Sequence, residues 1–309
     1  MLPEVMELRF VRFYLPQKGP RLGLLDGDGR VVDFTALSGG SVAAFENLLV
    51  ESEKSKRPLA QLVASYTGRG LPESGYDYNS LAGAPLHPDK PHLLLPLNPP
   101  EVWAAGVTYK RSVEARMAES KTSDIYDRVY AAPRPELFLK ATAARVVGSG
   151  DTIGVRSDSS SMVPEPELGL VLGANLQIIG YISGNDMTAR DIEGENPLYL
   201  PQAKIFNHSC ALGPVLALSE AIPDPYNLNI TCAIYRNGET VFSDKANTGQ
   251  LNRKLDELVS YLGRNNTILP GTVLLTGTCI VPPDSFTLLP GDLVEIAIDH
   301  LGVLSNRVA

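Results

Sequence analysis

The sequence predicts an α+β protein that is mostly β, with a smaller N-terminal α+β domain followed by a larger domain. Many short apolar or alternating segments are separated by turn residues, which is the pattern of short strands. No Gly-x-Gly-x-x-Gly motif or phosphate loop occurs, and the pattern does not indicate long βαβ units. Prolines are concentrated between residues 70 and 100, which predicts an extended connector without regular helix. We therefore place the domain boundary near its end, giving domains 1–98 and 99–309.

The composition excludes several classes of protein. A chain of 309 residues with 44% hydrophobic residues can bury a substantial core. The net charge of -8 argues against nucleic acid and anionic membranes as partners. No apolar run reaches the length of about 18 residues that a membrane span needs. Three widely spaced cysteines and an acidic N-terminus without a signal-peptide pattern predict a cytoplasmic protein.

The N-terminal domain shows strand and helix patterns without recognisable chemistry. Residues 5–15 alternate as a strand does, and residues 21–34 fit a hairpin around the turn Asp26-Gly27-Asp28-Gly29. Two short helical patterns follow at residues 42–49 and 59–63.

The second domain begins with two predicted strands that flank a charged segment. Residues 103–109 fit a short buried strand. Residues 110–130 are highly charged and partly helical in pattern, which fits a solvated surface helix or a lid. Residues 134–140 form another strand, with Glu136, Phe138 and Lys140 on one face. The Glu136 and Lys140 side chains are either a surface pair or part of a pocket.

A central hairpin carries the strongest chemical signal. Its strands are predicted at residues 163–172 and 178–182, and Asp186 follows the second strand. Glu165 and Glu167 leave the first strand on the same face, about 7 Å apart. Three carboxylates at the mouth of an apolar sheet repel each other unless a cation lies between them, and oxygen ligands suit Mg, Mn or Ca. The alternative is a solvated strand face.

The prolines beside these glutamates also bear on the strand. Pro164 and Pro166 remove two backbone donors, so they predict an edge strand or a bulge, and such positions often border sites.

Residues 192–204 look irregular and end at a single lysine. An apolar strand at residues 210–216 follows Lys204 closely, which predicts that Lys204 is partly buried and faces an anion. The remaining elements are a hairpin, an amphipathic helix that Gly263 ends, a strand leading into a glycine turn, and a last strand pair. The hairpin is predicted at residues 228–235 with 239–242, and the helix at residues 251–262. The strand is predicted at residues 273–278, and the last strand pair at residues 292–298 with 302–308.

Taken together and in order, the motifs of residues 99–309 resemble the fumarylacetoacetate hydrolase family. The shared motifs are Glu165-x-Glu167-Leu168, Gly180-Tyr181-x-x-x-Asn185-Asp186-x-Thr188-Ala189-Arg190-Asp191, Lys204 shortly before Leu212-Gly213-Pro214, Thr276-Gly277-Thr278, and Gly291-Asp292-x-Val294-Glu295. The resemblance implies a mixed β-sandwich or β-roll core and a homodimer or higher homo-oligomer.

The resemblance also implies a metal site and a substrate site. Magnesium, or manganese, would be held by the carboxylates of Glu165, Glu167 and Asp186. Lys204 and Thr278 would contact the carboxylate or keto oxygens of a small keto acid. Arg190 matches an arginine that supports the metal shell, and we place it with Tyr109 in the substrate-binding group.

One motif departs from the family. Its hydrolases carry a His-Glu pair that activates water, but here Ser112 stands in the histidine position and Ala115 in the glutamate position. The chain instead resembles the branch that contains the 2-keto-3-deoxy-D-arabinonate dehydratases, which also lacks that pair. The motifs of this narrower resemblance are Pro100-Glu101-Val102-Trp103, Arg134-Pro135-Glu136, Val155-Arg156-Ser157-Asp158 and residues 195–202. Glu136 matches a glutamate with an acid/base role in that branch.

The sequence therefore predicts a Mg-dependent dehydratase that converts a 2-keto-3-deoxy-pentonate to 2-oxoglutarate semialdehyde. Glu136 and Lys204 are the predicted catalytic residues. One alternative is an acylpyruvate or diketo-acid hydrolase in which Glu114, or water activated by the metal, replaces the missing pair. Another is a metal-containing binding protein without catalysis, against which the presence of Arg190, Lys204 and Thr278 argues.

Overall fold

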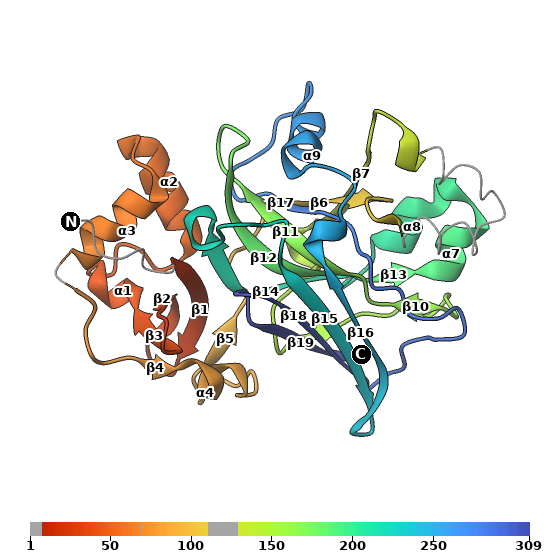
Figure 1. Cartoon of the computed structure of the whole chain (residues 1–309). Coiled ribbons are helices and arrows are strands. Elements are labelled where there is room, and N and C mark those ends of the chain that lie inside the picture. Colours follow the sequence, from red (N-terminus) through yellow and green to blue (C-terminus); the bar gives the residue numbers. More distant parts are fainter. Residues whose placement is uncertain (1–7, 69, 111–128) are drawn as a thin grey trace.

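A computed structural model describes residues 8–68, 70–110 and 129–309 of the chain, and its architecture is mostly β (Figure 1). The N-terminal elements lie on one side of the molecule, the large sheets occupy the middle, and α7 and α8 lie on the opposite side. This arrangement confirms the predicted mostly β fold of the α+β class. None of the helices in the described ranges is long and apolar enough to cross a membrane.

The N-terminal elements follow the predicted order. The strand and the hairpin are confirmed over the described residues. Both helical patterns correspond to helices, but the first begins at Phe45 rather than at residue 42, and both end later than the pattern indicated. The elements are β1 (Arg9–Leu15), β2 (Gly19–Leu25), β3 (Arg30–Asp33), α1 (Phe34–Leu37), α2 (Phe45–Ser55) and α3 (Leu59–Thr67).

The connector after residue 70 is more ordered than its proline content predicted. It contains β4 (Tyr76–Asp77), α4 (Tyr78–Ala82) and β5 (His92–Leu94), and β5 pairs with β1. The helix forms because no proline falls between Pro72 and Pro85, and because the Asp77 side chain accepts a hydrogen bond from the Ser80 N–H as an N-cap. The prediction that this stretch lacks helix is therefore wrong for residues 78–82.

One twelve-stranded sheet joins the N-terminal strands to the strands of the second half. Its order is β4-β3-β2-β1-β14-β12-β11-β17-β6-β7, with β5 paired to β1 and β8 paired to β14. The later members are β6 (Glu101–Gly106), β7 (Glu136–Thr142), β8 (Val146–Val147), β11 (Pro166–Leu172), β12 (Ile178–Asp186), β14 (Cys210–Leu218) and β17 (Val273–Leu275). A short 3-10 turn, η1 (Ala143–Arg145), links β7 to β8.

The β11–β12 hairpin confirms the predicted central hairpin but not its predicted place in the sheet. β11 is antiparallel to β12 on one side and to β17 on the other, so it is an interior strand. Pro166 is tolerated because it is the first residue of the strand. The prediction of an edge strand is therefore wrong for residues 169–171, whereas Pro166 pairs with β12 and with no residue of β17.

A second sheet packs against the large one and completes a sandwich-like core. Its order is β16-β15-β18-β19-β9. Alternate residues of β11, including Leu168 and Leu170, share one buried core with residues of β15 and β18 such as Ile230 and Ile296. The strands are β9 (Thr152–Ile153), β15 (Asn229–Arg236), β16 (Glu239–Asn247), β18 (Leu293–Ile298) and β19 (Val303–Val308). These bounds confirm the predicted hairpin across Asn237-Gly238 and the last strand pair.

Short helices occupy the stretch that the sequence predicted as irregular. α7 (Arg190–Glu195) and α8 (Leu200–Lys204) flank the 3-10 turn η2 (Pro197–Tyr199). Pro197 and Pro201 stand in the first turns of η2 and α8, where no backbone donor is needed.

The remaining small elements are the two-stranded sheet of β10 (Met162–Val163) and β13 (Thr188–Ala189), the 3-10 turns η3 (Ser219–Ala221) and η4 (Thr248–Gln250), and α9 (Leu255–Leu262). Gly263 ends α9 as predicted, although the helix begins at Leu255 rather than at Leu251. The charged segment considered as a lid or a surface helix lies largely outside the described residues, at 111–128.

Candidate functional site

The β11–β12 hairpin brings the three predicted carboxylates together. Even-numbered residues of β11 face the core between the sheets, so Glu165 and Glu167 leave on the opposite face. Pro166 pairs with Asn185, and the Asp186 N–H donates to the Glu165 carbonyl at 3.0 Å, which sets Asp186 beside Glu165. Carboxylate oxygens of Glu165, Glu167 and Asp186 lie within 4.8 Å of one another, so these three residues could hold a metal ion.

Glu167 is the most deeply placed of the three carboxylates. Its side chain is buried, and burial followed by the charges of Asp186 and Glu165 raises its pKa well above the ordinary value. The Gly277 N–H donates to Glu167 Oε2 at 2.6 Å from the turn that follows β17. Gly277 adopts a φ of 93°, a conformation that glycine accepts without strain. The predicted glycine turn therefore supplies a backbone donor to the carboxylate cluster.

Two buried lysines face the carboxylates from different elements. Lys204, at the end of α8, donates to Glu165 at 2.6 Å, to Asp186 Oδ2 at 3.2 Å and to Thr188 Oγ1 at 2.7 Å. Lys140, on β7, forms an ion pair with Asp186 Oδ1 at 2.6 Å. Both lysine side chains are fully buried, so Lys204 is buried more completely than the sequence predicted. The anions that it was predicted to face are the proposed metal ligands.

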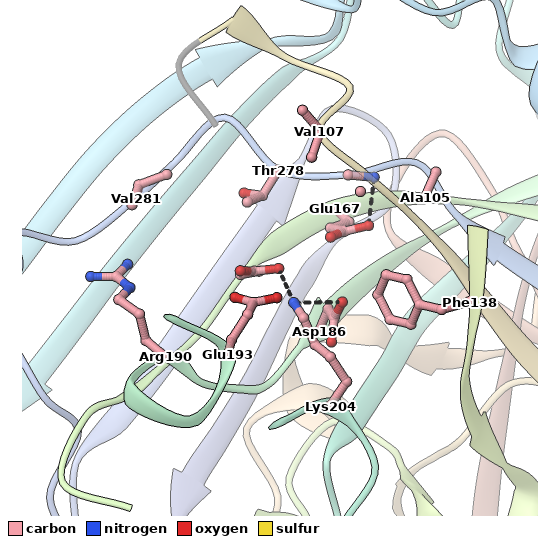
Figure 2. A pocket seen from close by; sticks show the side chains of 13 residues that line it. Ala105, Val107, Phe138, Glu167, Asp186, Arg190, Glu193, Lys204, Thr278 and Val281 are labelled. Atoms are coloured by element: carbon pink, nitrogen blue, oxygen red, sulfur yellow. Dashed lines mark hydrogen bonds and ion pairs between the residues drawn. The ribbon is translucent and has the colours of Figure 1, made fainter. Parts of the chain in front are cut away.

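The carboxylates and Lys204 line one pocket (Figure 2). Arg190 and Glu193 enter it from α7, and Thr278 enters it from the turn after β17. The Arg190 guanidinium donates to the Pro282 carbonyl at 3.0 Å, which fixes the side chain at the pocket wall. Phe138 forms an apolar side of the pocket, with its ring 5.7 Å from Lys204 Nζ. Cationic, hydroxyl and carboxylate groups thus surround one small space.

Glu136 and Tyr109 are placed next to this pocket rather than among its lining residues. Glu136 pairs with Gly106, and a Cβ atom added to Gly106 would lie 2.1 Å from Glu136 Oε2. Gly106 itself lines the pocket, so the Glu136 carboxylate lies directly behind that wall. Tyr109 is buried, and burial, followed by the nearby Cys279 and Glu167, raises its pKa well above the ordinary value. Ser112, Glu114 and Ala115 lie outside the described residues.

Sequence reasoning did not select two residues that belong to the site. Lys140 was left between a surface pair and a pocket, and the signal for burial was its position in the apolar run Leu137-Phe138-Leu139-Lys140-Ala141. Glu193 falls in the stretch predicted to be irregular, where no face could be assigned. In α7 it lies three residues after Arg190 and therefore on the same helix face.

The fold and the site define a protein of sandwich-like mixed sheets with a buried carboxylate cluster suited to a divalent cation. A family model described as the fumarylacetoacetate (FAA) hydrolase C-terminal domain matches residues 101–309. The chain belongs to the fumarylacetoacetate hydrolase family, as its ordered motifs predicted.

Similar proteins point to one branch of this family. The chain is 50% identical over 217 residues to a probable 2-keto-3-deoxyxylonate dehydratase of Haloferax volcanii, covering 70% of this chain and 75% of that protein. It is 46% identical over 239 residues to the 2-dehydro-3-deoxy-D-arabinonate dehydratase of Saccharolobus solfataricus, covering 76% of this chain and 80% of that protein. A solved structure of 2-keto-3-deoxy-D-arabinonate dehydratase complexed with magnesium and 2,5-dioxopentanoate matches with a TM-score of 0.81 and 37% identity, covering 97% of this chain and 98% of that chain.

Proposed function

We propose that the protein is a magnesium-dependent hydro-lyase that dehydrates a 2-keto-3-deoxy sugar acid. The substrate is a 2-keto-3-deoxy-pentonate such as 2-keto-3-deoxy-D-arabinonate, and the product is 2-oxoglutarate semialdehyde, which is 2,5-dioxopentanoate. The observation that carries the proposal is the match over 97% of the chain to the dehydratase bound to magnesium and 2,5-dioxopentanoate. The carboxylate cluster beside Lys204 supplies the matching chemistry.

The carboxylate cluster fits a magnesium or manganese ion. Its donors are all oxygen atoms, which these hard ions prefer. Burying three carboxylates together is unfavourable, as the raised pKa of Glu167 shows, and a cation among them relieves that cost. Glu165, Glu167 and Asp186 would hold the ion. When bound, the ion polarises the carboxylate and ketone of an α-keto acid and so makes the neighbouring C–H bond more acidic.

The residues of the chain would then move the protons of an elimination. A base removes the C3 proton, and the C4 hydroxyl leaves as water after accepting a proton from an acid. A proton shift from C5 to C3 converts the resulting unsaturated alcohol to an enol with a C4=C5 double bond. Transfer of the O5 proton to C4 then gives the C5 aldehyde, so only one water molecule is lost overall. Glu136 is our candidate for this proton transfer, with Lys204 binding a substrate oxygen or assisting at C3. Because Glu136 lies behind Gly106, its carboxylate would reach the substrate past this glycine, which has no side chain to block it.

Other pocket residues would bind the substrate rather than react with it. Thr278 would orient the carboxylate, and Arg190 would support the acidic side of the pocket from α7. Tyr109 is buried beside Glu167 and does not line the pocket, so it would support the substrate-binding residues from behind the pocket wall.

The proposal is tested by incubating the purified protein with Mg²⁺ and 2-keto-3-deoxy-D-arabinonate and following 2-oxoglutarate semialdehyde. Glu136→Gln should retain Mn²⁺ and substrate binding but lose turnover, because the amide cannot exchange the proton. Acylpyruvates serve as the comparison substrates, since release of pyruvate or acetate from them would favour the hydrolase alternative. Absence of turnover on this pentonate and on close 2-keto-3-deoxy acids would reject the dehydratase assignment.

We further propose a homodimer or larger homo-oligomer in the cytoplasm, with no nucleic-acid or membrane partner. The oligomer rests on the family resemblance, and the compartment on three cysteines that are all free. The net charge of -8 supports the absence of polyanionic partners. The division into domains 1–98 and 99–309 also remains a prediction.

A further inference from the structure

Lys140 is a buried cation for which the proposed reaction has no role. Its ammonium group contacts Asp186 Oδ1 at 2.6 Å, the Met187 carbonyl at 2.8 Å and the Lys204 carbonyl. These contacts are one ion pair, with Asp186, and two hydrogen bonds, to the carbonyl oxygens. The side chain is fully buried and does not line the pocket. Lys140 therefore acts on the site from behind, through Asp186 and through the backbone of Lys204.

The position of Lys140 changes the net charge of the pocket. Four carboxylates and two cationic side chains line the pocket. With every carboxylate ionised, as metal binding requires, the lining alone carries two net negative charges: Glu165, Glu167, Asp186 and Glu193 against Arg190 and Lys204. A divalent metal ion would bring the lining to neutrality. Lys140 adds one positive charge directly behind Asp186. The Glu136 carboxylate behind the Gly106 wall adds one negative charge, so the metal-loaded site is neutral with Lys140 and would carry one net negative charge without it. Lys140 therefore keeps the site from repelling the single carboxylate of a keto acid.

We propose that Lys140 is a positioning residue whose charge keeps the metal-loaded pocket from becoming anionic toward an anionic substrate, while its ion pair with Asp186 and its two hydrogen bonds to the Met187 and Lys204 carbonyls hold Asp186 and Lys204 in place. This inference rests on the proposed function, because it requires a divalent metal and an α-keto carboxylate in this pocket. Lys140 touches neither of them. It weakens metal binding slightly by repulsion and strengthens the subsequent binding of the anion.

The surroundings of Lys140 keep its charge effective at the site. Its Nζ lies 5.5 Å from the centre of the Phe206 ring, and the buried Cys210 thiol is another neighbour. These groups screen charge far less than water does, so the effect of Lys140 extends to the pocket. A lysine that only stabilised the fold would have no reason to affect metal and anion binding in opposite directions.

The experiment measures two binding constants in the full-length protein without turnover. Mn²⁺ affinity is obtained by electron paramagnetic resonance, and pyruvate affinity at saturating Mn²⁺ by calorimetry. Lys140→Gln keeps a hydrogen-bond donor but removes the charge. It should bind Mn²⁺ at least as tightly as the wild type and bind pyruvate about tenfold more weakly. Lys140→Arg keeps the charge and should stay within about threefold of the wild type for pyruvate.

The matched control is Lys245→Gln on β16, because Lys245 is an exposed lysine of the second sheet whose loss should change neither constant. If Lys140→Gln weakens Mn²⁺ and pyruvate binding alike, or changes neither, the charge role is wrong. Loss of pyruvate affinity in a folded Lys140→Arg protein also overturns the charge role. If the Lys140→Gln protein fails to fold, the Lys140→Arg measurement alone decides the question. Normal Mn²⁺ and pyruvate binding without dehydratase turnover would reject only the proposed reaction.

Discussion

At the residue scale, Glu167 shows a conflict between stability and metal binding. Its carboxylate is buried beside two others, an arrangement that costs free energy in the metal-free protein. Glu167→Gln keeps the shape and an acceptor for the Gly277 N–H but removes the charge. We expect the metal-free variant to melt about 2 °C higher than the wild type and to lose most of its Mn²⁺ affinity.

Calorimetry of the metal-free proteins and a Mn²⁺ titration check this expectation. Glu239→Gln on β16 is the control, because Glu239 is exposed and should leave both values unchanged. A variant that melts lower than the wild type and binds Mn²⁺ normally would contradict the role given to Glu167.

The sequence could predict which residues form the carboxylate cluster and that Lys204 faces an anion, but not that Lys140 also compensates the cluster. Glu165 and Glu167 share a face because side chains alternate along any strand, and a hairpin returns Asp186 to them. Lys140 lies on a strand that is distant in sequence from Asp186 and from Lys204, so their contact depends on the sheet order, which local patterns do not contain. Glu136 illustrates the same limit, since its face was predicted and its distance from the pocket was not.

At the scale of elements, the turn after β17 is built for close approach to the site. Gly277 has a positive φ, and a Cβ atom there would lie 2.0 Å from Thr108 Oγ1 and 3.0 Å from the Ala105 carbonyl. Gly277→Ala should therefore cost about 3 kcal/mol of unfolding free energy and reduce Mn²⁺ affinity, because the donor to Glu167 must move.

Substitution of Gly291 separates the cost of backbone strain from the cost of crowding around the added Cβ atom. Gly291 has a φ of 89° with nothing within 4 Å of an added Cβ, so Gly291→Ala should cost only about 1 kcal/mol and leave Mn²⁺ binding intact. Urea unfolding of both variants measures the difference. Equal costs for the two substitutions would show that crowding at Gly277 contributes nothing.

The start of β18 is held by an ion pair whose strength depends on pH. Arg236 donates to both oxygens of Asp292 at 2.8 Å. Burial raises the pKa of Asp292, but the Arg236 and Leu289 hydrogen bonds outweigh it, and the net pKa falls below the ordinary 3.8. An acid with a lowered pKa stabilises the fold above its unfolded value and loses that contribution as the pH falls through the folded value.

Asp292→Asn should therefore destabilise the protein by about 2 kcal/mol at pH 7. The difference from the wild type should shrink as the pH falls from the ordinary 3.8 through the lowered pKa of the folded wild-type carboxyl, because that carboxyl then becomes protonated. Urea titrations of both proteins at several pH values measure it. A difference that stays constant down to the acid limit would assign the loss to packing rather than to charge.

Elements with strong periodicity were predictable, and those set by end effects were not. The β15–β16 hairpin and α9 follow from an Asn-Gly turn and from a regular apolar stripe. The helices α4, α7 and α8 are five or six residues long, too short for a periodic pattern. α4 depends on its Asp77 cap and α8 on proline in its first turn, features that are equally common in loops, whereas α7 has neither a side-chain cap nor a proline in its first turn.

At the scale of the whole molecule, the large sheet and its core cross the boundary predicted near residue 98. β1 pairs with β14, and one buried cluster contains Phe10 and Phe45 together with Val171 and Ile182. The motifs that predicted the catalytic part lie after residue 99, whereas this shared core depends on side chains from both parts. Because neither part buries its apolar face without the other, we expect the described chain to unfold as one cooperative unit.

Phe10→Ala tests this cooperativity from the N-terminal side. The ring is fully buried, so its loss should cost about 3–4 kcal/mol. Trp103 on β6 is the single tryptophan of the chain, so its fluorescence reports on the second part alone. If the core is shared, the urea midpoints from Trp103 fluorescence and from circular dichroism should coincide and fall together in Phe10→Ala. Val241→Ala, at an exposed position of β16, should leave both midpoints in place. A Trp103 midpoint that does not move, beside an earlier transition in circular dichroism, would mean that the two parts unfold separately and that the metal site does not depend on the N-terminal strands.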